Sequence, residues 1–252
     1  MTDPTAKTLL ITGASRGIGR ATALLAARKG WSVAINYRSD KAMAEDTAAQ
    51  VRNAGAGAEV FQGDVAVSGD VARVFDGALA AFGQLDGVVV NAGIVADALP
   101  LAEMSDARLR KMIDTNVLGA MYCAREAAKC LPRAMTEPSA SLVFLSSAAA
   151  RLGSPFEYVD YAASKGAIDT LTIGLSKELA AQNIRVNAVR PGLSETEIHA
   201  SGGQPDRAQR VGQNVPFGRP GTADEVAEAV LWLCGEGASY TTGALIDVAG
   251  GR

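Results

Sequence analysis

Histidine and cysteine are scarce in this 252-residue chain, which contains one histidine and three cysteines. The single histidine, His199, excludes a histidine-rich metal site and leaves one candidate base for a serine–histidine mechanism. We therefore expect no metal. The cysteines, Cys123, Cys130 and Cys234, form no CxxC motif. An odd number of cysteines, without a recognisable secretion signal, favours reduced thiols and a cytoplasmic location.

Long apolar runs and clusters of basic residues are also absent. The formal net charge is −3, and no run of lysine and arginine offers the positive surface that nucleic acids require. No apolar stretch reaches about 18 residues, the length at which a membrane-spanning helix is expected. Residues 1–7 are polar and lack the apolar core of a signal peptide. We expect neither a nucleic acid nor a membrane as a partner.

Short apolar segments alternate with longer segments of helical periodicity along the chain. Strands that are apolar almost throughout are typical of a parallel sheet covered on both faces. We predict an α/β fold: a single doubly wound Rossmann domain over residues 1–252, with a mostly parallel, seven-stranded sheet flanked by helices on both faces. The predicted strands are 7–12, 32–37, 59–62, 85–90, 141–146, 184–189 and 244–248, and the predicted helices are 17–29, 41–53, 68–82, 106–133, 158–182 and 224–234.

One connection is long and polar. Residues 193–215 include Gly202, Gly203 and Pro205 and few large apolar side chains. Because long irregular segments in compact proteins usually serve function, we expect this one to form a substrate lid.

Glycines cluster between the first predicted strand and the first predicted helix. They follow a G-x-x-x-G-x-G spacing, which differs from the common G-x-G-x-x-G of dinucleotide folds. Glycines let the chain turn sharply and let backbone N–H groups approach a pyrophosphate, which the helix N-terminus also attracts. The predicted phosphate-binding residues are Gly13, Ser15, Arg16, Gly17, Ile18 and Gly19.

The same segment permits a different interpretation. Gly13 to Gly17 also match G-x-S-x-G, the nucleophile turn of serine hydrolases. That mechanism needs a downstream histidine, and only His199 is available, within the polar segment. A hydrolase also leaves the motifs described below without a use.

The end of the second predicted strand is where nucleotide folds select between NAD and NADP. An acidic residue there binds the ribose 2′-hydroxyl, whereas an arginine accepts a 2′-phosphate. Here the strand ends in Tyr37, Arg38 and Ser39, with no carboxylate before Asp40. With Arg16 nearby, two guanidinium groups suit a dianion, so we predict NADP(H) rather than NAD(H).

Further short motifs follow the glycine loop in chain order. These segments are TGASRGIG (12–19), GDV (63–65), NAG (91–93), NV (116–117), SS (146–147), YAASK (161–165), RVNAVRPG (185–192) and GG (250–251). Together they resemble the short-chain dehydrogenase/reductase family, particularly 3-oxoacyl-(acyl carrier protein) reductases and sugar dehydrogenases, over nearly the whole chain. The resemblance implies hydride transfer between a nicotinamide and a carbonyl or secondary alcohol.

Tyr161 and Lys165 stand four residues apart on one predicted helix and therefore share a face. We expect the ammonium group, together with an oxidised nicotinamide, to lower the pKa of the phenol. Tyr161 would then be a usable acid or base near neutral pH. The resemblance implies that Lys165 also binds the nicotinamide ribose and that Tyr161 is a cofactor contact as well.

The resemblance implies two more catalytic residues. Ser147 would hydrogen-bond the substrate oxygen; it is the second serine of its pair, and Ser146 is the alternative. Asn116 would distort its helix and hold a water that continues the proton path to Lys165.

The remaining expected cofactor contacts also follow the family motifs. Asp64 is expected either to bind the adenine amino group or to cap a loop. The family usually shows P-G-x-[IV]-x-T after the sixth strand, and this chain has Ser194 at the aliphatic position. These expected contacts are Asp64, Val65, Asn91, Ala92, Gly93, Pro191, Gly192, Leu193 and Thr196.

The substrate is the least defined feature. Arg151 and Arg207 are possible anion contacts, and Arg125, Lys129 and Arg133 are possible carrier-protein contacts. A generic ketone reductase is favoured over a 3-oxoacyl-(acyl carrier protein) reductase or a glucose/sugar dehydrogenase. A non-catalytic NADP-sensing protein is the alternative of another class. The resemblance also implies a homotetramer, or a homodimer.

Overall fold

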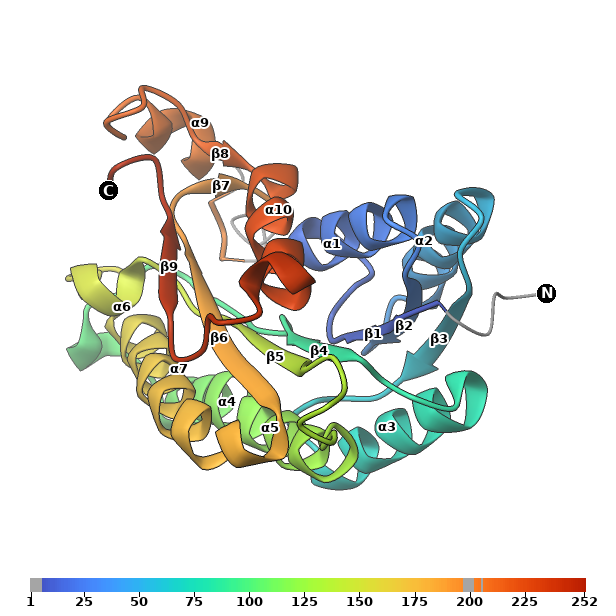
Figure 1. Ribbon diagram of the computed structural model, residues 1–252. Coiled ribbons are helices and arrows are strands. Elements are labelled where there is room, and N and C mark those ends of the chain that lie inside the picture. Colours follow the sequence, from blue (N-terminus) through green and yellow to red (C-terminus); the bar gives the residue numbers. More distant parts are fainter. Residues whose placement is uncertain (1–5, 197–201, 205) are drawn as a thin grey trace.

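A parallel sheet of seven strands forms the centre of the molecule (Figure 1). The computed structural model describes residues 6–196, 202–204 and 206–252. The strand order is β3-β2-β1-β4-β5-β6-β9, and each neighbouring pair is parallel. The predicted α/β Rossmann fold is confirmed, and the sheet is parallel throughout. Its strands are β1 (Thr8–Ile11), β2 (Ser32–Tyr37), β3 (Ala58–Gln62), β4 (Gly87–Val90), β5 (Ala140–Leu145), β6 (Ile184–Pro191) and β9 (Leu245–Val248).

Helices cover both faces of the sheet (Figure 1). One face carries α1 (Gly17–Arg28), α2 (Lys41–Asn53) and α10 (Ala223–Cys234). The other carries α3 (Ser68–Phe82), α5 (Gly119–Cys130) and α7 (Val159–Glu178), with α4 (Asp106–Ile113) beside them. No helix among the described residues has the length and apolar character needed to cross a membrane.

Alternating side chains on each strand build two separate cores. Leu9 and Ile11 of β1 pack beneath α1, α2 and α10, whereas Leu10 faces the opposite helices. Both sides of the strand are buried, which explains why the strands are apolar along their whole length. This double burial fixes the register of each strand, because a shift by one residue would exchange the two faces.

The predicted helix over residues 106–133 is one element in the sequence pattern but three in the structure. It divides into α4, a π-helical turn (Asp114–Leu118) and α5, which ends at Cys130. The π turn inserts one extra residue per turn and turns Asn116 inward, as described below. Similarly, the helix predicted over 158–182 is α7 followed by a short 3₁₀ turn (Ala180–Gln182).

The expected lid contains several small elements. Within residues 193–215 lie the short strand β7 (Ser194–Glu195) and the helix α9 (Arg207–Gly212). β7 pairs in parallel with β8 (Gly221–Thr222), which lies beyond the segment. Residues 197–201 and 205 lie outside the described residues, and His199 is among them. α6 (Ala149–Leu152) lies between β5 and α7.

Candidate active site

The strand order changes direction at β1, whose two neighbours are β2 and β4. In such sheets a crevice forms at the carboxyl ends of the strands beside this switch point. A cleft of about 770 Å³ lies here, lined by the loops that follow β1, β2, β3 and β4. The predicted cofactor residues that line it are Gly13, Ser15, Arg16, Gly17, Ile18, Arg38, Ser39, Asp64, Val65, Asn91, Ala92, Gly93 and Thr196.

Two glycines, one in the loop after β1 and one in the first turn of α1, have no room for a side chain. A Cβ on Gly13 would lie 3.1 Å from the Cα of Ala92, and Gly13 also has a φ of +64°. A Cβ on Gly19 would lie 2.6 Å from Nδ2 of Asn91. Gly19 therefore serves the close packing of α1 against the neighbouring loop, and it is absent from the cleft lining. The start of α1 has no side-chain cap, so its N–H groups remain directed at the cleft.

Asn91 joins the ends of β1 and β4. Its Nδ2 donates to the carbonyl oxygens of Thr12 and Gly13, at 2.9 and 3.1 Å. In return, Oγ1 of Thr12 accepts from the backbone N–H of Asn91, at 3.0 Å. These bonds hold the glycine loop at a fixed position over the sheet edge.

The end of β2 differs from the prediction at one residue. Arg38 and Ser39 are exposed and line the cleft with Arg16, but Tyr37 does not line it. The Tyr37 side chain is buried in the core beneath α1 and α2, because it shares its strand face with Val33 and Ile35. A contact of Tyr37 with the cofactor would therefore come from its backbone, and that contact stays a prediction.

Asn36, which the sequence analysis did not select, organises this corner instead. Its Oδ1 accepts from the N–H of Gly13 at 3.3 Å, and its Nδ2 donates to the carbonyl oxygen of Gly63 at 3.0 Å. It therefore connects the loops after β1 and β3. A buried asparagine inside an apolar strand is the signal that could have revealed it.

Asp64 both lines the cleft and shapes its own loop. Its Oδ1 accepts from the N–H of Ala66 at 3.0 Å, and its own N–H donates to Asp70. Of the two roles expected for Asp64, the contact within its own loop is therefore present. The Asp64 carboxylate also borders the cleft.

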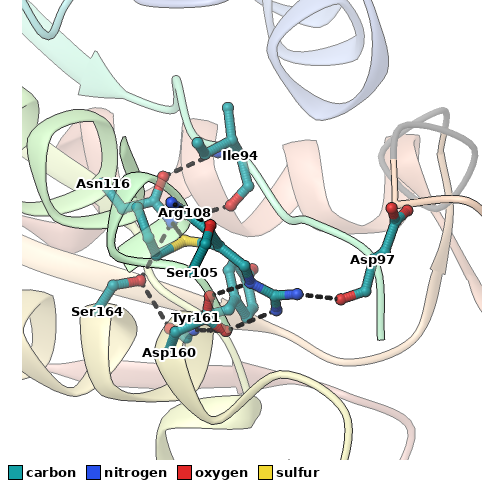
Figure 2. Close-up of polar contacts among 9 residues, drawn as sticks. Ile94, Asp97, Ser105, Arg108, Asn116, Asp160, Tyr161 and Ser164 are labelled. Atoms are coloured by element: carbon teal, nitrogen blue, oxygen red, sulfur yellow. Dashed lines mark hydrogen bonds and ion pairs between the residues drawn. The ribbon is translucent and has the colours of Figure 1, made fainter. Parts of the chain in front are cut away.

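Asn116 lies at the π turn and binds the loop that follows β4 (Figure 2). Its Oδ1 accepts from the N–H of Ile94 at 2.8 Å, and its Nδ2 lies 2.9 Å from the carbonyl oxygen of Ile94. The same Nδ2 is 3.1 Å from Oγ of Ser164 on α7. A Cβ on Gly93 would lie 3.3 Å from Oδ1 of Asn116 and 3.5 Å from Nζ of Lys165. Glycine at position 93 thus leaves the path between these two polar groups open.

A second, smaller cavity of about 180 Å³ adjoins the cleft and shares Ile18, Asn91, Gly93, Val95 and Thr196 with it. It brings together residues from β5, α7 and the end of β6, which are far apart in sequence. The predicted site residues that line it are Ser147, Tyr161, Lys165, Pro191, Gly192, Leu193 and Thr196.

The two candidate serines have different partners. Ser147 forms a hydrogen bond with Tyr161, and its Oγ accepts from the N–H of Ala149 at 3.1 Å. Oγ of Ser146 is instead 2.6 Å from Oδ1 of Asp169 and is buried. Of the pair, only Ser147 is therefore bonded to the tyrosine.

The pKa of Tyr161 is raised in this structure, whereas the sequence predicted a lowered one. Burial raises the pKa of the phenol above its ordinary value, and the hydrogen bond with Ser147 only partly opposes this. Lys165 does not offset the burial: its Nζ donates to the carbonyl oxygen of Leu145 at 2.6 Å and lies 5.7 Å from the centre of the tyrosine ring. The expectation that Lys165 lowers the pKa of Tyr161 is therefore wrong for the protein's own groups.

Lys165 itself has a shifted pKa. Burial lowers the pKa of its ammonium group to about 8, against the opposing charge of Asp169. Losing its proton near neutral pH would be unusual for an exposed lysine. Such perturbed groups in a cleft are typical of functional sites.

An ion pair that the sequence analysis missed anchors the start of α7 (Figure 2). Nε and Nη2 of Arg108 donate to the two carboxylate oxygens of Asp160, at 2.8 and 3.1 Å. Both side chains are nearly buried, with 11% and 3% exposed. Oδ1 of Asp160 also accepts from the N–H of Tyr161 at 2.9 Å. The pair therefore holds the backbone of Tyr161 against α4.

Two residues of the expected lid contact the loop before α7 and the residue at its start. Arg207 donates to both carboxylate oxygens of Glu157, at 2.9 and 2.7 Å, and lies over the ring of Tyr158 at 5.1 Å. Nε2 of Gln204 donates to the hydroxyl oxygen of Tyr158 at 2.7 Å. Arg151, the other possible anion contact, lies 3.4 Å from Asp247.

The hydrolase alternative depends on His199, which lies outside the described residues. Ser15, its nucleophile, lines the larger cleft, whereas Tyr161 and Ser147 line the smaller cavity. Within the described ranges, no three histidine, cysteine, aspartate or glutamate side chains gather in a metal-binding group.

Known proteins resemble this chain over nearly its full length. A family model described as enoyl-(acyl carrier protein) reductase matches residues 13–252. The uncharacterized oxidoreductase YgfF of Escherichia coli K12 is 48% identical over 96% of this chain and 98% of its own. The 3-oxoacyl-(acyl carrier protein) reductase FabG of Staphylococcus aureus is 35% identical over 97% of each chain. A solved 3-ketoacyl-(acyl carrier protein) reductase of Brucella melitensis, complexed with NADH, superposes with a TM-score of 0.90 at 31% identity, over 98% of each chain.

The family model, the full-length relatives and the solved structure agree with the observed α/β fold. The protein belongs to the short-chain dehydrogenase/reductase family of oxidoreductases.

Proposed function

We propose that the protein is an NADP(H)-dependent reductase of ketones, acting between a carbonyl and its secondary alcohol. The observation that carries this proposal is the small cavity in which Ser147, Tyr161 and Lys165 meet beside the nucleotide-sized cleft. The cavity holds a proton donor and adjoins the cofactor cleft, so a hydride and a proton can reach the same substrate there. Residues 1–252 would act as one domain, with residues 193–215 as the substrate lid.

The cleft suits a dinucleotide. Close packing leaves no room for a Cβ on Gly13 or Gly19, and the N–H groups at the start of α1 can donate hydrogen bonds to a pyrophosphate. Arg16, Arg38 and Ser39 border the ribose end of the cleft. Asp40, the carboxylate nearest to this end, accepts from the N–H of Met43 at 3.0 Å and so caps α2.

The arginines at this end support a preference for a 2′-phosphate. No hydrogen bond or ion pair of the Arg16 or Arg38 side chain is found among the described residues, so both guanidinium groups are available to a dianion. NADH bound to the Brucella relative concerns that protein and leaves this preference as a proposal.

Replacing Arg38 by alanine tests the cofactor preference. We expect Arg38→Ala to lower kcat/KM for NADPH by about 10- to 150-fold, because a charged hydrogen bond contributes roughly 1.5–3 kcal/mol. The value for NADH should change little. Initial rates with each cofactor provide the measurement. Arg28→Ala, an exposed arginine at the far end of α1, is the matched control. Equal losses with both cofactors would contradict the proposed contact.

In the proposed mechanism the bound nicotinamide supplies the hydride. Tyr161 donates its proton to the substrate oxygen, and the raised pKa of its phenol keeps it protonated for this step. Ser147 donates a hydrogen bond to the same oxygen as negative charge develops there. Lys165, held by the carbonyl oxygen of Leu145, would bind the nicotinamide ribose, and its Nζ lies 5.7 Å from the centre of the Tyr161 ring. Asn116 would hold the water that continues the proton path to Lys165.

The pKa of Lys165 predicts a pH dependence. The protonated lysine predominates below pH about 8 and is lost above it. We therefore expect kcat/KM for NADPH, which reports groups of the free enzyme, to fall about tenfold per pH unit above that value. A pH–rate profile at saturating carbonyl substrate provides the measurement. A profile that stays flat well beyond pH 8 would argue against a required protonated Lys165.

The substrate class needs a direct screen. NADPH oxidation should be followed with β-ketoesters, acyl thioesters, diketones and sugar-derived carbonyls. Tight NADPH binding without turnover of any of them would favour the NADP-sensing alternative and overturn the proposal.

A 3-oxoacyl-(acyl carrier protein) reductase is the second candidate, favoured by the likeness to the Staphylococcus and Brucella enzymes. The proposed carrier contacts support it weakly. Arg125 and Lys129 both pair with Glu126, and Arg133 donates to backbone oxygens and lies near Asp86. Their charges are therefore largely neutralised. Turnover of acyl carrier protein thioesters far above that of small thioesters would establish it.

We also propose a cytoplasmic location and a homotetramer, or a homodimer. Both rest on the family and on the composition described above. Light scattering tests the assembly directly, and a monomer would refute it.

A further inference from the structure

A buried ion pair lies behind Lys165. Asp169 lies outside the sequence motifs, and Arg190 lies within RVNAVRPG (185–192), where the sequence assigned it no role. Asp169 follows Lys165 by one turn of α7, and Arg190 comes from β6. Nε and Nη2 of Arg190 lie 3.0 and 2.8 Å from Oδ2 of Asp169. The two side chains are only 14% and 12% exposed. Such a pair is costly to bury unless its remaining lone pairs are also bonded.

The second carboxylate oxygen connects the pair to the proposed active site. Oδ1 of Asp169 lies 2.6 Å from Oγ of Ser146, and that hydroxyl lies 3.1 Å from the backbone oxygen of Lys165. The Asp169 carboxylate is therefore bonded to Ser146, directly after β5. The neighbours of Ser146 are Leu145, whose carbonyl oxygen accepts from Lys165, and Ser147, the proposed catalytic serine.

The groups around Lys165 come from several elements. On α7 these are Asp169 and the ionisable Tyr161, while the segment after β5 and the π turn contribute the neutral Ser146, Ser147 and Asn116. The cations of Arg207 and Arg252 line the same cavity as Lys165. Asp169 is the carboxylate whose charge opposes the loss of the lysine's proton. Arg190 lies beyond it, and Asp247 of β9 is 3.8 Å from Nη1 of Arg190 and 3.4 Å from Nε of Arg151.

We propose that Asp169 and Arg190 are positioning residues that hold the Lys165 segment against β5 and determine the pH at which Lys165 loses its proton. The proposal rests on the role of Lys165 in the proposed function. Asp169 supplies a negative charge one helical turn from the ammonium group, and Arg190 partly balances that charge and keeps the carboxylate in place.

Neutralising Asp169 and neutralising Arg190 should shift the pKa of Lys165 in opposite directions. In Asp169→Asn, the unbalanced Arg190 cation disfavours the ammonium form, so the pKa of Lys165 should fall by about one unit or more. In Arg190→Gln, the carboxylate acts without its counter-charge, so the same pKa should rise. Arg190→Lys keeps the charge and should leave the titration close to that of the wild type.

Titration of lysines labelled with 13C at the ε carbon provides the main measurement, because NMR reads the proton on Lys165 without turnover. The Lys165 signal is assigned by its loss in Lys165→Met. The high-pH limb of kcat/KM should move in the same direction in each variant. Asp86→Asn, at the amino end of β4 and paired with Arg133, is the control and should move neither.

The outcomes separate the two proposals. A Lys165 signal that titrates at the wild-type pH in both single variants would overturn the role of Asp169 and Arg190. A shifted signal without any shift in the rate profile would support the pair but contradict the proposed function of Lys165. If a single variant does not fold, the double variant Asp169→Asn/Arg190→Gln decides. Its Lys165 should titrate below the wild type, because the nearer charge has been removed, and an unchanged value would overturn the proposal.

Discussion

Replacing Tyr161 by phenylalanine is expected to lower kcat for carbonyl reduction by about 10²–10⁴-fold, which is the usual contribution of a positioned acid. The variant loses only the hydroxyl that bonds Ser147 in the small cavity. Contacts with the cleft are unaffected, since Tyr161 does not line it. NADPH should therefore bind with nearly wild-type affinity, as fluorescence titration can measure. The combination of lost turnover and retained binding distinguishes a catalytic hydroxyl from a structural one.

Tyr158→Phe is the matched control for this variant. Tyr158 lies three residues before Tyr161 and lines the same cavity, but its hydroxyl oxygen accepts a hydrogen bond from Gln204 of the expected lid. Its removal should affect KM more than kcat. A larger loss of kcat in Tyr158→Phe than in Tyr161→Phe would reassign the acid. Full activity in Tyr161→Phe would overturn the proposed mechanism.

Removing Arg108 is expected to have the largest effect on stability. In Arg108→Met the carboxylate of Asp160, which is 3% exposed, loses its bidentate partner. Breaking a buried pair in this way typically costs about 3–5 kcal/mol, because the remaining charge stays buried without a counter-charge. For a chain of this size each kcal/mol lowers Tm by roughly 2–4 °C. Chemical denaturation and thermal unfolding at one fixed protein concentration provide the measurement.

Two comparisons make this prediction specific. Arg219→Met breaks an exposed pair with Glu225 and should leave the unfolding midpoint within error of the wild type. Arg108→Met/Asp160→Asn removes both charges and should recover much of the lost stability. Equal midpoints for Arg108→Met and Arg219→Met would show that the buried pair contributes little. Because Asp160 also holds the N–H of Tyr161, Arg108→Met should in addition lower kcat.

The sequence by itself determined the fold and most of the cleft. Apolar runs such as Leu9–Ile11 can be buried on two faces only within a covered parallel sheet, so the sheet followed from periodicity. The glycine loop was also predictable, because Gly13 adopts a positive φ and lies in contact with Ala92. In both cases the information is local: a residue type is required by its own backbone or by its strand neighbours.

Contacts between distant segments were decided only by the tertiary structure. The spacing of Tyr161 and Lys165 predicted a shared face, but burial reversed the expected direction of the tyrosine's pKa. Tyr37 was assigned to the cleft from its place at the end of β2, yet the face that it shares with Val33 and Ile35 turns it into the core.

The same limit applies to the residues that hold the site in place. Arg108 meets Asp160 across 52 positions, and Arg190 meets Asp169 across 21. Charged residues are common in any sequence, and nothing in their spacing shows which of them will be buried together. The identity of the reacting groups was therefore readable from the chain, whereas burial and long-range pairing, which control their protonation and position, became visible only once helices and sheet were assembled.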